Sequence, residues 1–252
     1  SIDFTTMNTG ILQTLAKEFA VVDFPFLFSD AKEADAIMDG PVGQQLADKL
    51  PDKGLVNLAY YDLGFRNLTN SKRPVRKLED LQGMSIRVIQ SPIYIDAFTA
   101  LGATAVPMAF SEVYFALEQK KIDGQENPLV HMYSNKMQEV QKYISLSNHV
   151  YTPVALVVSE KFWKGLSDAD KAGIQKAADE AKLLQRQLLD EGDKDVIKKF
   201  GDAGVKVDAI PAAELAKIQE KVKPVVAKFA PQIGEEFIKG FYAEIEKARA
   251  AN

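Results

Sequence analysis

Short β-branched segments alternate with helical segments through the middle of the chain. Residues 85–89 and 103–107 have the composition of strands, and the segments that follow them, 94–101 and a stretch that Ser111 would cap, are helical. Strands that alternate with helices form βαβ units, whose strands pair mainly in parallel. We therefore predict an α/β fold and expect ligands at the carboxyl ends of the strands.

Two further strands and one long helix frame this region. Residues 55–61 and 150–158 are rich in β-branched and aromatic side chains and are predicted strands. Ser167 and Asp170 have the spacing of a helix N-cap, and an apolar stripe continues from there to Leu189. A helix of that length can lie across two lobes rather than inside one.

The composition argues against several classes of function. The 252 residues include 31 Lys and Arg against 35 Asp and Glu, and the net charge of −4 does not suit a general nucleic-acid binder. The chain contains no cysteine and only two histidines, so thiolate metal sites and cysteine nucleophiles are excluded. We expect neither a metal nor a cofactor. No apolar segment is long enough to span a bilayer.

No enzyme signature is present in the sequence. Phosphate loops, dinucleotide-binding glycine motifs, nucleophile elbows and paired-histidine zinc helices are all absent. His131 and His149 have no acidic or serine motif beside them, and a general base needs an orienting partner. Both histidines are therefore interpreted as structural, and the chain is not expected to be an enzyme.

Arg87 is the residue whose position most needs a chemical explanation. It lies in the middle of a predicted strand, between Ile86 and Val88, where its guanidinium must reach an edge or be paired. A buried arginine without a partner is strongly unfavourable, so a carboxylate has to come from the protein or from a ligand. From the residues alone, an internal salt bridge and a ligand site both stay open.

Several segments resemble one family of transport proteins. They are residues 23–28 (DFPFLF), 81–88 (LQGMSIRV), 107–117 (PMAFSEVYFAL) and 122–128 (IDGQENP), in the order of that family. The chain resembles the extracytoplasmic solute-binding subunit of tripartite ATP-independent periplasmic (TRAP) transporters, the DctP family. The resemblance implies a two-lobed periplasmic binding protein of the Venus flytrap kind (type II-like), with the long helix spanning both lobes.

The resemblance also implies roles for individual residues. Arg87 corresponds to the family's arginine that grips a substrate carboxylate through two parallel hydrogen bonds, and Arg66 resembles a second arginine near the site. Asn127 resembles an asparagine that hydrogen-bonds the acid, and Phe110 resembles an aromatic residue that packs on it. Positions that vary with the substrate or add polar contacts are Gln90, Ser91, Val154, Asn8 and Thr9. For Arg66 and Phe110 a purely structural role stays open.

The same resemblance divides the chain into two lobes. Residues 1–64 and 153–192 form the first lobe, and residues 65–152 and 193–252 form the second lobe, which carries the ligand-anchoring arginine. Family members begin with a strand–helix–strand–helix portion that precedes the strand matched by Ser1, Ile2 and Asp3. We therefore expect the first lobe to lack its N-terminal portion in this sequence.

The function implied is periplasmic binding of a small organic acid and its delivery to a TRAP-type membrane permease for uptake driven by an ion gradient. Four-carbon dicarboxylates are the first expectation, because Arg66 and Arg87 could hold the two ends of such a ligand. Sugar acids, keto acids and aromatic acids use the same anchor and stay open. The expected partners are this carboxylate and the permease, without nucleic acid, and we expect a monomer. Two alternatives use the same fold and stay open: a small-molecule enzyme with Glu126 or His149 as general base, and an extracellular sensor.

Overall fold

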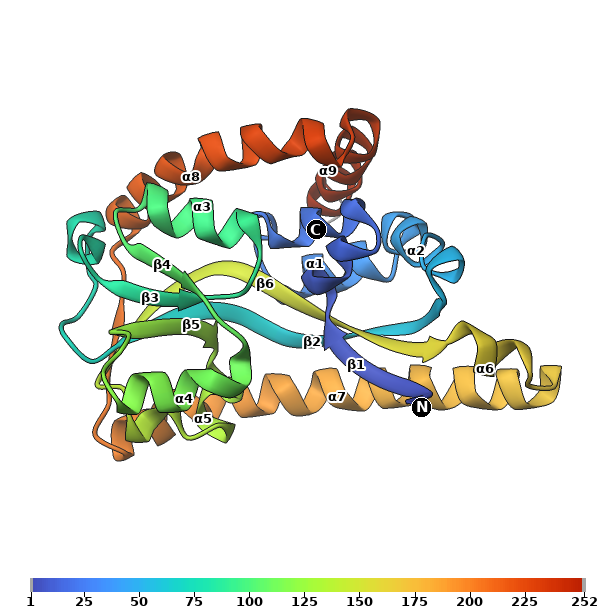
Figure 1. Ribbon diagram of the computed structural model, residues 1–252, viewed down its shortest axis with the longest axis horizontal. Helices are drawn as coiled ribbons and strands as arrows, with labels where there is room; N and C mark the ends of the chain where they lie inside the picture. The colour runs from blue at the N-terminus through green and yellow to red at the C-terminus, as the bar shows by residue number, and fades with distance from the viewer. Residues whose placement is uncertain (1, 251–252) are drawn as a thin grey trace.

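A seven-stranded mixed sheet crosses the whole molecule (Figure 1). The structure is a computed structural model that describes residues 2–250; Ser1 and the last two residues lie outside it. The strands are β1 (Phe4–Asn8), β2 (Leu55–Asn70), β3 (Ser85–Val88), β4 (Thr104–Pro107), β5 (Gly124–Pro128), β6 (Tyr143–Ser159) and β7 (Lys206–Ala209). They lie in the order β1-β6-β2-β5-β3-β4, with β7 paired to β6. The predicted α/β class is confirmed.

Strand pairing differs from the mainly parallel pattern that the sequence predicted. β3 pairs in parallel with β4 and β5, and β6 pairs in parallel with β7. In contrast, β6 is antiparallel to β1 and β2, and β2 is antiparallel to β5. The prediction fails at β2, which is antiparallel to both of its neighbours, and at the pairing of β6 with β1 and β2, because β2 and β6 form an antiparallel ribbon through both halves of the molecule.

β2 and β6 are also much longer than predicted, with 16 and 17 residues. The second half of β2 contains Arg66, Asn67 and Asn70, which carry no strand signal, yet all three are buried between β5 and β6. Tertiary pairing overrides local preference here. The two strands shift register at three points, and at the middle one, between Asp62 and Gly64, Gly64 has a φ of +99° that a glycine adopts without strain.

Helices cover the sheet on both sides (Figure 1). They are α1 (Ala31–Met38), α2 (Pro41–Ala47), α3 (Pro92–Ala100), α4 (Phe110–Glu118), α5 (Leu129–Ser134), α6 (Glu160–Lys164), α7 (Asp168–Asp202), α8 (Ala212–Ile233) and α9 (Glu235–Ala250). Two 3-10 helices, η1 (Thr9–Thr14) and η2 (Lys17–Asp23), follow β1. The N-cap residue of α4 is Ala109 and not Ser111, so this helix begins earlier than predicted.

α7 is the long helix that the sequence predicted. It has 35 residues and runs along both halves of the sheet (Figure 1), and the Ser167 hydroxyl accepts from the backbone N–H of Asp170 at its start. The side-chain amide of Gln185 forms two hydrogen bonds with the backbone of Asp62 on β2. It donates to the Asp62 carbonyl at 2.7 Å and accepts from the Asp62 N–H at 3.0 Å. Arg186 adds an ion pair to the Asp62 carboxylate at 3.2 Å. α7 therefore holds β2 at its register shift, where the strand passes from one half to the other.

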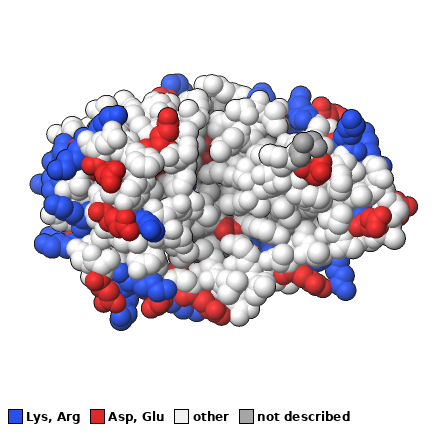
Figure 2. Space-filling model, turned by 60° about the horizontal axis from the view of Figure 1, so that its bottom comes forward, with Lys and Arg blue, Asp and Glu red and all other residues white. Residues whose placement is uncertain are grey.

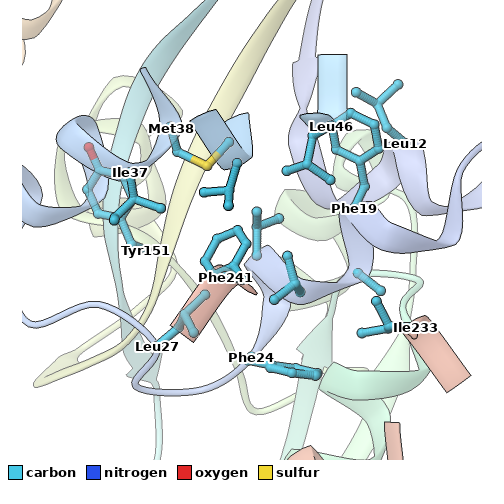
Figure 3. Packing of buried hydrophobic residues seen from close by; sticks show 14 of the residues in the cluster. Leu12, Phe19, Phe24, Leu27, Ile37, Met38, Leu46, Tyr151, Ile233 and Phe241 are labelled. Carbon is cyan, nitrogen blue, oxygen red and sulfur yellow. The ribbon is translucent and has the colours of Figure 1, made fainter. Parts of the chain in front are cut away.

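The hydrophobic core is divided between the two halves. One cluster surrounds η1, η2, α1 and α2 and includes Phe19, Leu46 and, from α9, Phe241 (Figure 3). A second cluster packs β3 and α3 against the first half of α8, through Ile218 and Val222. The last helix therefore lies with the first lobe, although the sequence analysis assigned residues 193–252 to the second. An amphipathic helix does not reveal from its own sequence which core its apolar face will meet, and α8 carries the chain between the two.

We predict that Phe241→Ala lowers the free energy of unfolding by about 3–5 kcal/mol, because it opens a cavity in a packed cluster. Phe241 is fully buried and contacts Phe28, with ring centroids 6.2 Å apart. The matched control is Phe115→Ala on α4, where the ring is 61% exposed and the expected loss is below about 1 kcal/mol. Urea unfolding followed by circular dichroism measures both. Equal losses for the two variants would contradict the placement of α9 in the first core.

Candidate functional site

A cleft of about 890 Å³ lies between the two halves, at the carboxyl ends of β3 and β4. On the face shown in Figure 2, the surface is furrowed between its left and right parts, and much of the surface beside the furrow is uncharged. β1 and η1 line the cleft from one half, and the starts of α3 and α4 line it from the other. The lining residues that carry the argument below are Asn8, Gln13, Arg66, Arg87, Gln90, Ser91, Phe110, Asn127 and His131.

Arg87 is buried in the wall of this cleft, and its side chain is only partly satisfied by the protein. Nε and Nη2 both donate to the backbone carbonyl of Met108, at 3.0 and 2.6 Å. The guanidinium carbon lies 5.9 Å from the centre of the Phe110 ring. Within residues 2–250 no carboxylate forms an ion pair with Arg87. Burial lowers the pKa of Arg87 to about 10, and Arg66 contributes to this shift while Glu126 opposes it.

Two helices begin at the same cleft. α3 starts after Ser91 and α4 starts after Ala109, and neither N-cap side chain bonds to the first turn. The first backbone N–H groups of a helix have no partner inside the helix and carry a partial positive charge, so they favour a nearby anion. The βαβ arrangement of β3 and β4 therefore places two helix N-termini beside Arg87.

Arg66 lines the cleft too, but its charge is already compensated. Nε and Nη2 bind the two carboxylate oxygens of Glu126, at 2.5 and 2.9 Å, and Nη2 also donates to the Asn127 side chain at 3.0 Å. Nη1 donates to Thr152 at 3.3 Å. The Arg66 charge holds the pKa of Glu126 below its usual value, despite complete burial. The salt bridge considered for Arg87 from the sequence is thus formed by Arg66 instead.

His149 continues this buried network away from the cleft. Its Nε2 lies 3.0 Å from Glu126 and its Nδ1 lies 2.8 Å from the Ser147 hydroxyl. The ring of Phe98 packs edge-on against it, with centroids 5.5 Å apart. Every polar atom of the two proposed general bases, Glu126 and His149, therefore already has a partner, which fits the structural interpretation of His149.

The structure brings most of the predicted site residues together. Arg87, Arg66, Asn127, Phe110, Gln90, Ser91 and Asn8 all line the cleft. Val154 does not; it pairs with Asn8 and Tyr61 across the sheet, so it supports the strand that carries a lining residue. Thr9 is buried and donates to the carbonyl of Pro153 at 2.6 Å. The roles of these residues toward a ligand stay predictions.

Sequence reasoning missed other lining residues. His131 lies at the start of α5, with its ring centroid 4.6 Å from that of Phe110, and the sequence analysis interpreted it as structural. Gln13 and Met108 lack any motif that sets them apart from ordinary loop and strand-end residues. The available signal for Met108 was its position at the carboxyl end of a predicted strand, where ligands are expected.

Two further properties concern the described part of the chain. No group of three or more His, Cys, Asp or Glu residues in it is placed to hold a metal ion. None of the helices between residues 2 and 250 combines the length and apolar character that crossing a membrane requires.

Comparison with known proteins identifies the family. A family model described as "Bacterial extracellular solute-binding protein, family 7" (DctP) matches residues 1–232. The chain belongs to the DctP family. Its solute-binding role follows from that membership, and the resemblance seen in the sequence is confirmed.

Individual members of the DctP family agree with this assignment. The 2,3-diketo-L-gulonate-binding periplasmic protein YiaO of Escherichia coli is 37% identical over 92% of this chain and 71% of its own length. The C4-dicarboxylate-binding periplasmic protein DctP of Rhodobacter capsulatus is 34% identical over 88% and 67%. The crystal structure of the sugar acid binding protein DctPAm of Advenella mimigardefordensis, in complex with galactonate, superimposes with a TM-score of 0.95 at 43% identity, over 98% of this chain and 79% of that one. The predicted two-lobed α/β fold is thereby confirmed.

We predict that Glu126→Gln lowers the free energy of unfolding by about 3–5 kcal/mol, because it leaves the buried Arg66 charge without its carboxylate. Urea unfolding at neutral pH measures the loss. As a control, Glu118→Gln removes the same charge at an exposed position of α4 and is expected to change stability by less than about 0.5 kcal/mol. A Glu126→Gln protein as stable as the control would show that the ion pair is not needed to hold Arg66.

Proposed function

We propose that this protein binds a small organic acid in the periplasm and delivers it to a TRAP-type membrane permease. The observation that carries the proposal is Arg87, which is 4% exposed in the wall of a cleft and has no carboxylate partner in the described chain. An anion that enters the cleft would compensate this cation. The relatives named for diketogulonate, C4-dicarboxylate and galactonate support an organic acid as that anion.

The free edge of Arg87 suits a carboxylate. The edge formed by Nε and Nη2 is occupied by the Met108 carbonyl, whereas Nη1 and the second hydrogen of Nη2 have no partner within residues 2–250. These two N–H groups point in parallel and match the spacing of the two carboxylate oxygens. The carbonyl of Met108 therefore fixes the guanidinium in the orientation that presents its fork to a ligand.

The charges of the cleft favour a ligand with one carboxylate and several hydroxyl groups. Arg66 is bound at both edges and is neutralised by Glu126. Burial lowers the pKa of His131 to about 4, with Arg66 and Arg87 adding to the shift, so this ring is neutral at pH 7. The remaining polar lining is uncharged and consists of Thr6, Asn8, Gln13, Thr14, Gln90, Ser91 and Asn127. We therefore favour a sugar acid or another hydroxylated monocarboxylate over the four-carbon dicarboxylate expected first.

Capture of the ligand follows from the position of the cleft between two halves. Asn8 and Gln13 approach from one half and Arg87 and Gln90 from the other, so a ligand that touches both sets favours the closed arrangement. Closure bends the β2–β6 ribbon, which is the main connection between the halves. The closed complex is the form that the permease would recognise.

Binding without chemical conversion fits the site better than catalysis. The carboxylate of Glu126, the strongest candidate base, accepts hydrogen bonds from Arg66 and lies beside His149, and Arg66 lowers its pKa. A base that is fully bonded and weakly basic cannot readily accept a substrate proton. The monomeric state and the permease partner stay predictions of the sequence analysis.

We predict that Arg87→Ala weakens binding of D-galactonate by about 30- to 4000-fold, because removing one partner of a buried charge pair costs about 2–5 kcal/mol. Arg87→Lys keeps the charge but loses the fork, so an intermediate loss is expected. Isothermal titration calorimetry measures both affinities.

Arg76→Ala is the matched control for Arg87→Ala. Arg76 is exposed and forms a surface ion pair with Asp208, so the same substitution there leaves affinity unchanged. Retention of wild-type affinity by a folded Arg87→Ala protein would refute the carboxylate clamp.

We further predict that D-galactonate raises the melting temperature of the protein more than succinate does at equal concentration. Galactonate offers one carboxylate and a chain of hydroxyls to the uncharged amides, whereas the second carboxylate of succinate would find no free cation. A thermal-shift series with both acids, and with neutral galactose as the control for the carboxylate, measures this. A larger rise in melting temperature with succinate would instead support a four-carbon dicarboxylate as the ligand.

A further inference from the structure

A buried carboxylate outside the cleft lining links two cleft residues that come from different halves. Asp23, at the end of η2, is buried, and its Oδ2 accepts hydrogen bonds from Gln13 Nε2 at 3.0 Å and Ser91 Oγ at 2.9 Å. Gln13 belongs to η1 and Ser91 precedes α3, and both line the cleft. Asp23 can therefore act on a ligand through these two side chains.

The surroundings of Asp23 fix the orientation of Gln13. The side-chain nitrogen of Gln13 donates to Asp23 and also to the carbonyl of Gly10, at 2.7 Å. Both amide hydrogens are thus used, which leaves the side-chain oxygen of Gln13 for a ligand hydroxyl. A Cβ atom at Gly10 would lie 2.0 Å from Asp23 Oδ1, so only glycine at this position leaves room for the carboxylate.

The charge of Asp23 changes near neutral pH. Burial raises its pKa to about 7, although the hydrogen bonds from Ser91 and Gln13 and the charge of Arg66 favour the ionised form; Glu126 adds to the rise. Arg66 is itself paired with Glu126, and no cation in the described residues forms an ion pair with Asp23.

The other titratable groups on elements packed near η2 do not neutralise Asp23 either. Tyr94 of α3 faces Asp23, but burial raises its pKa and the phenol stays neutral. His149 of β6 is engaged with Glu126. Lys228 of α8 forms an ion pair at the surface.

We propose that Asp23 is a positioning residue that sets the affinity of the cleft for its acid ligand, and that ligand binding is coupled to uptake of a proton by Asp23. The inference rests on the proposed function, because it requires an anion in the cleft. Ionised Asp23 orients Gln13 and Ser91, yet its negative charge opposes the ligand carboxylate. The protonated carboxyl keeps one oxygen as acceptor and removes the repulsion. By linkage, affinity falls as the pH rises through about 7.

The test measures D-galactonate affinity by isothermal titration calorimetry between pH 5.5 and 8.5. If the ligand raises the pKa of Asp23 by about one unit, wild-type affinity falls roughly five- to tenfold across this range. Asp23→Asn, which is isosteric and uncharged, is expected to show a flat profile. Glu18→Gln removes a charge from the same 3-10 helix at a surface pair with Lys49 and is expected to keep the wild-type slope.

A second measurement on the wild-type protein does not depend on how Asp23→Asn folds. Titrations at pH 7.5 in buffers of different ionisation enthalpy count the protons bound, and about half a proton per ligand is expected for a one-unit rise in the pKa. Ligand binding without proton uptake would overturn the role of Asp23 and leave the proposed ligand class standing. The same holds if affinity falls with pH equally steeply in wild type and Asp23→Asn. Absence of galactonate binding at every pH would overturn the proposed ligand class, and the coupling with it.

Discussion

The antiparallel ribbon of β2 and β6 is the constraint on which the rest of the structure depends. β1 joins the ribbon in one half, and β5 extends it toward β3 and β4 in the other, so the cleft between the halves lies across it. α7 runs along the same ribbon and fixes β2 at Asp62 through Gln185 and Arg186. The proposed closure of the cleft would therefore bend two paired strands beside the register shift between Asp62 and Gly64.

The ribbon also explains why one of the two arginines at the cleft is paired with a carboxylate and the other is not. Arg66 projects from β2 next to β5, and the pairing of these strands places the Glu126 carboxylate within 2.5 Å of its guanidinium. Arg87 lies on β3, and the group it meets is the Met108 carbonyl at the end of β4. Arg66 thus links β2 to β5, whereas Arg87 keeps three of its five N–H donors unused by the described chain. A count of arginines in the sequence would have assigned both to the ligand.

The sequence predicted the class of fold, the long helix and seven of the residues that line the cleft, because these depend on local patterns and on family motifs. It did not predict that Arg66 would pair with Glu126, since the two are 60 positions apart and only the strand register brings them together. The second half of β2 was missed because buried Asn67 and Asn70 have the composition of a loop. Asp23 was noticed only as part of an aromatic segment. Its contact with Gln13 arises from the packing of η1 on η2, and its contact with Ser91 from packing between the halves, neither of which a local pattern encodes.

Arg87 reduces the stability of the empty protein and thereby favours acids over neutral ligands. Burial lowers the pKa of Arg87 to about 10, so at neutral pH the folded state disfavours the charged form by on the order of 3 kcal/mol relative to the unfolded chain. A ligand carboxylate removes much of this penalty when it pairs with the guanidinium, whereas a neutral sugar that fills the same space leaves the penalty in place. Discrimination between an acid and its uncharged analogue therefore follows from the uncompensated cation itself, and the hydroxyl-binding residues are left to distinguish one acid from another.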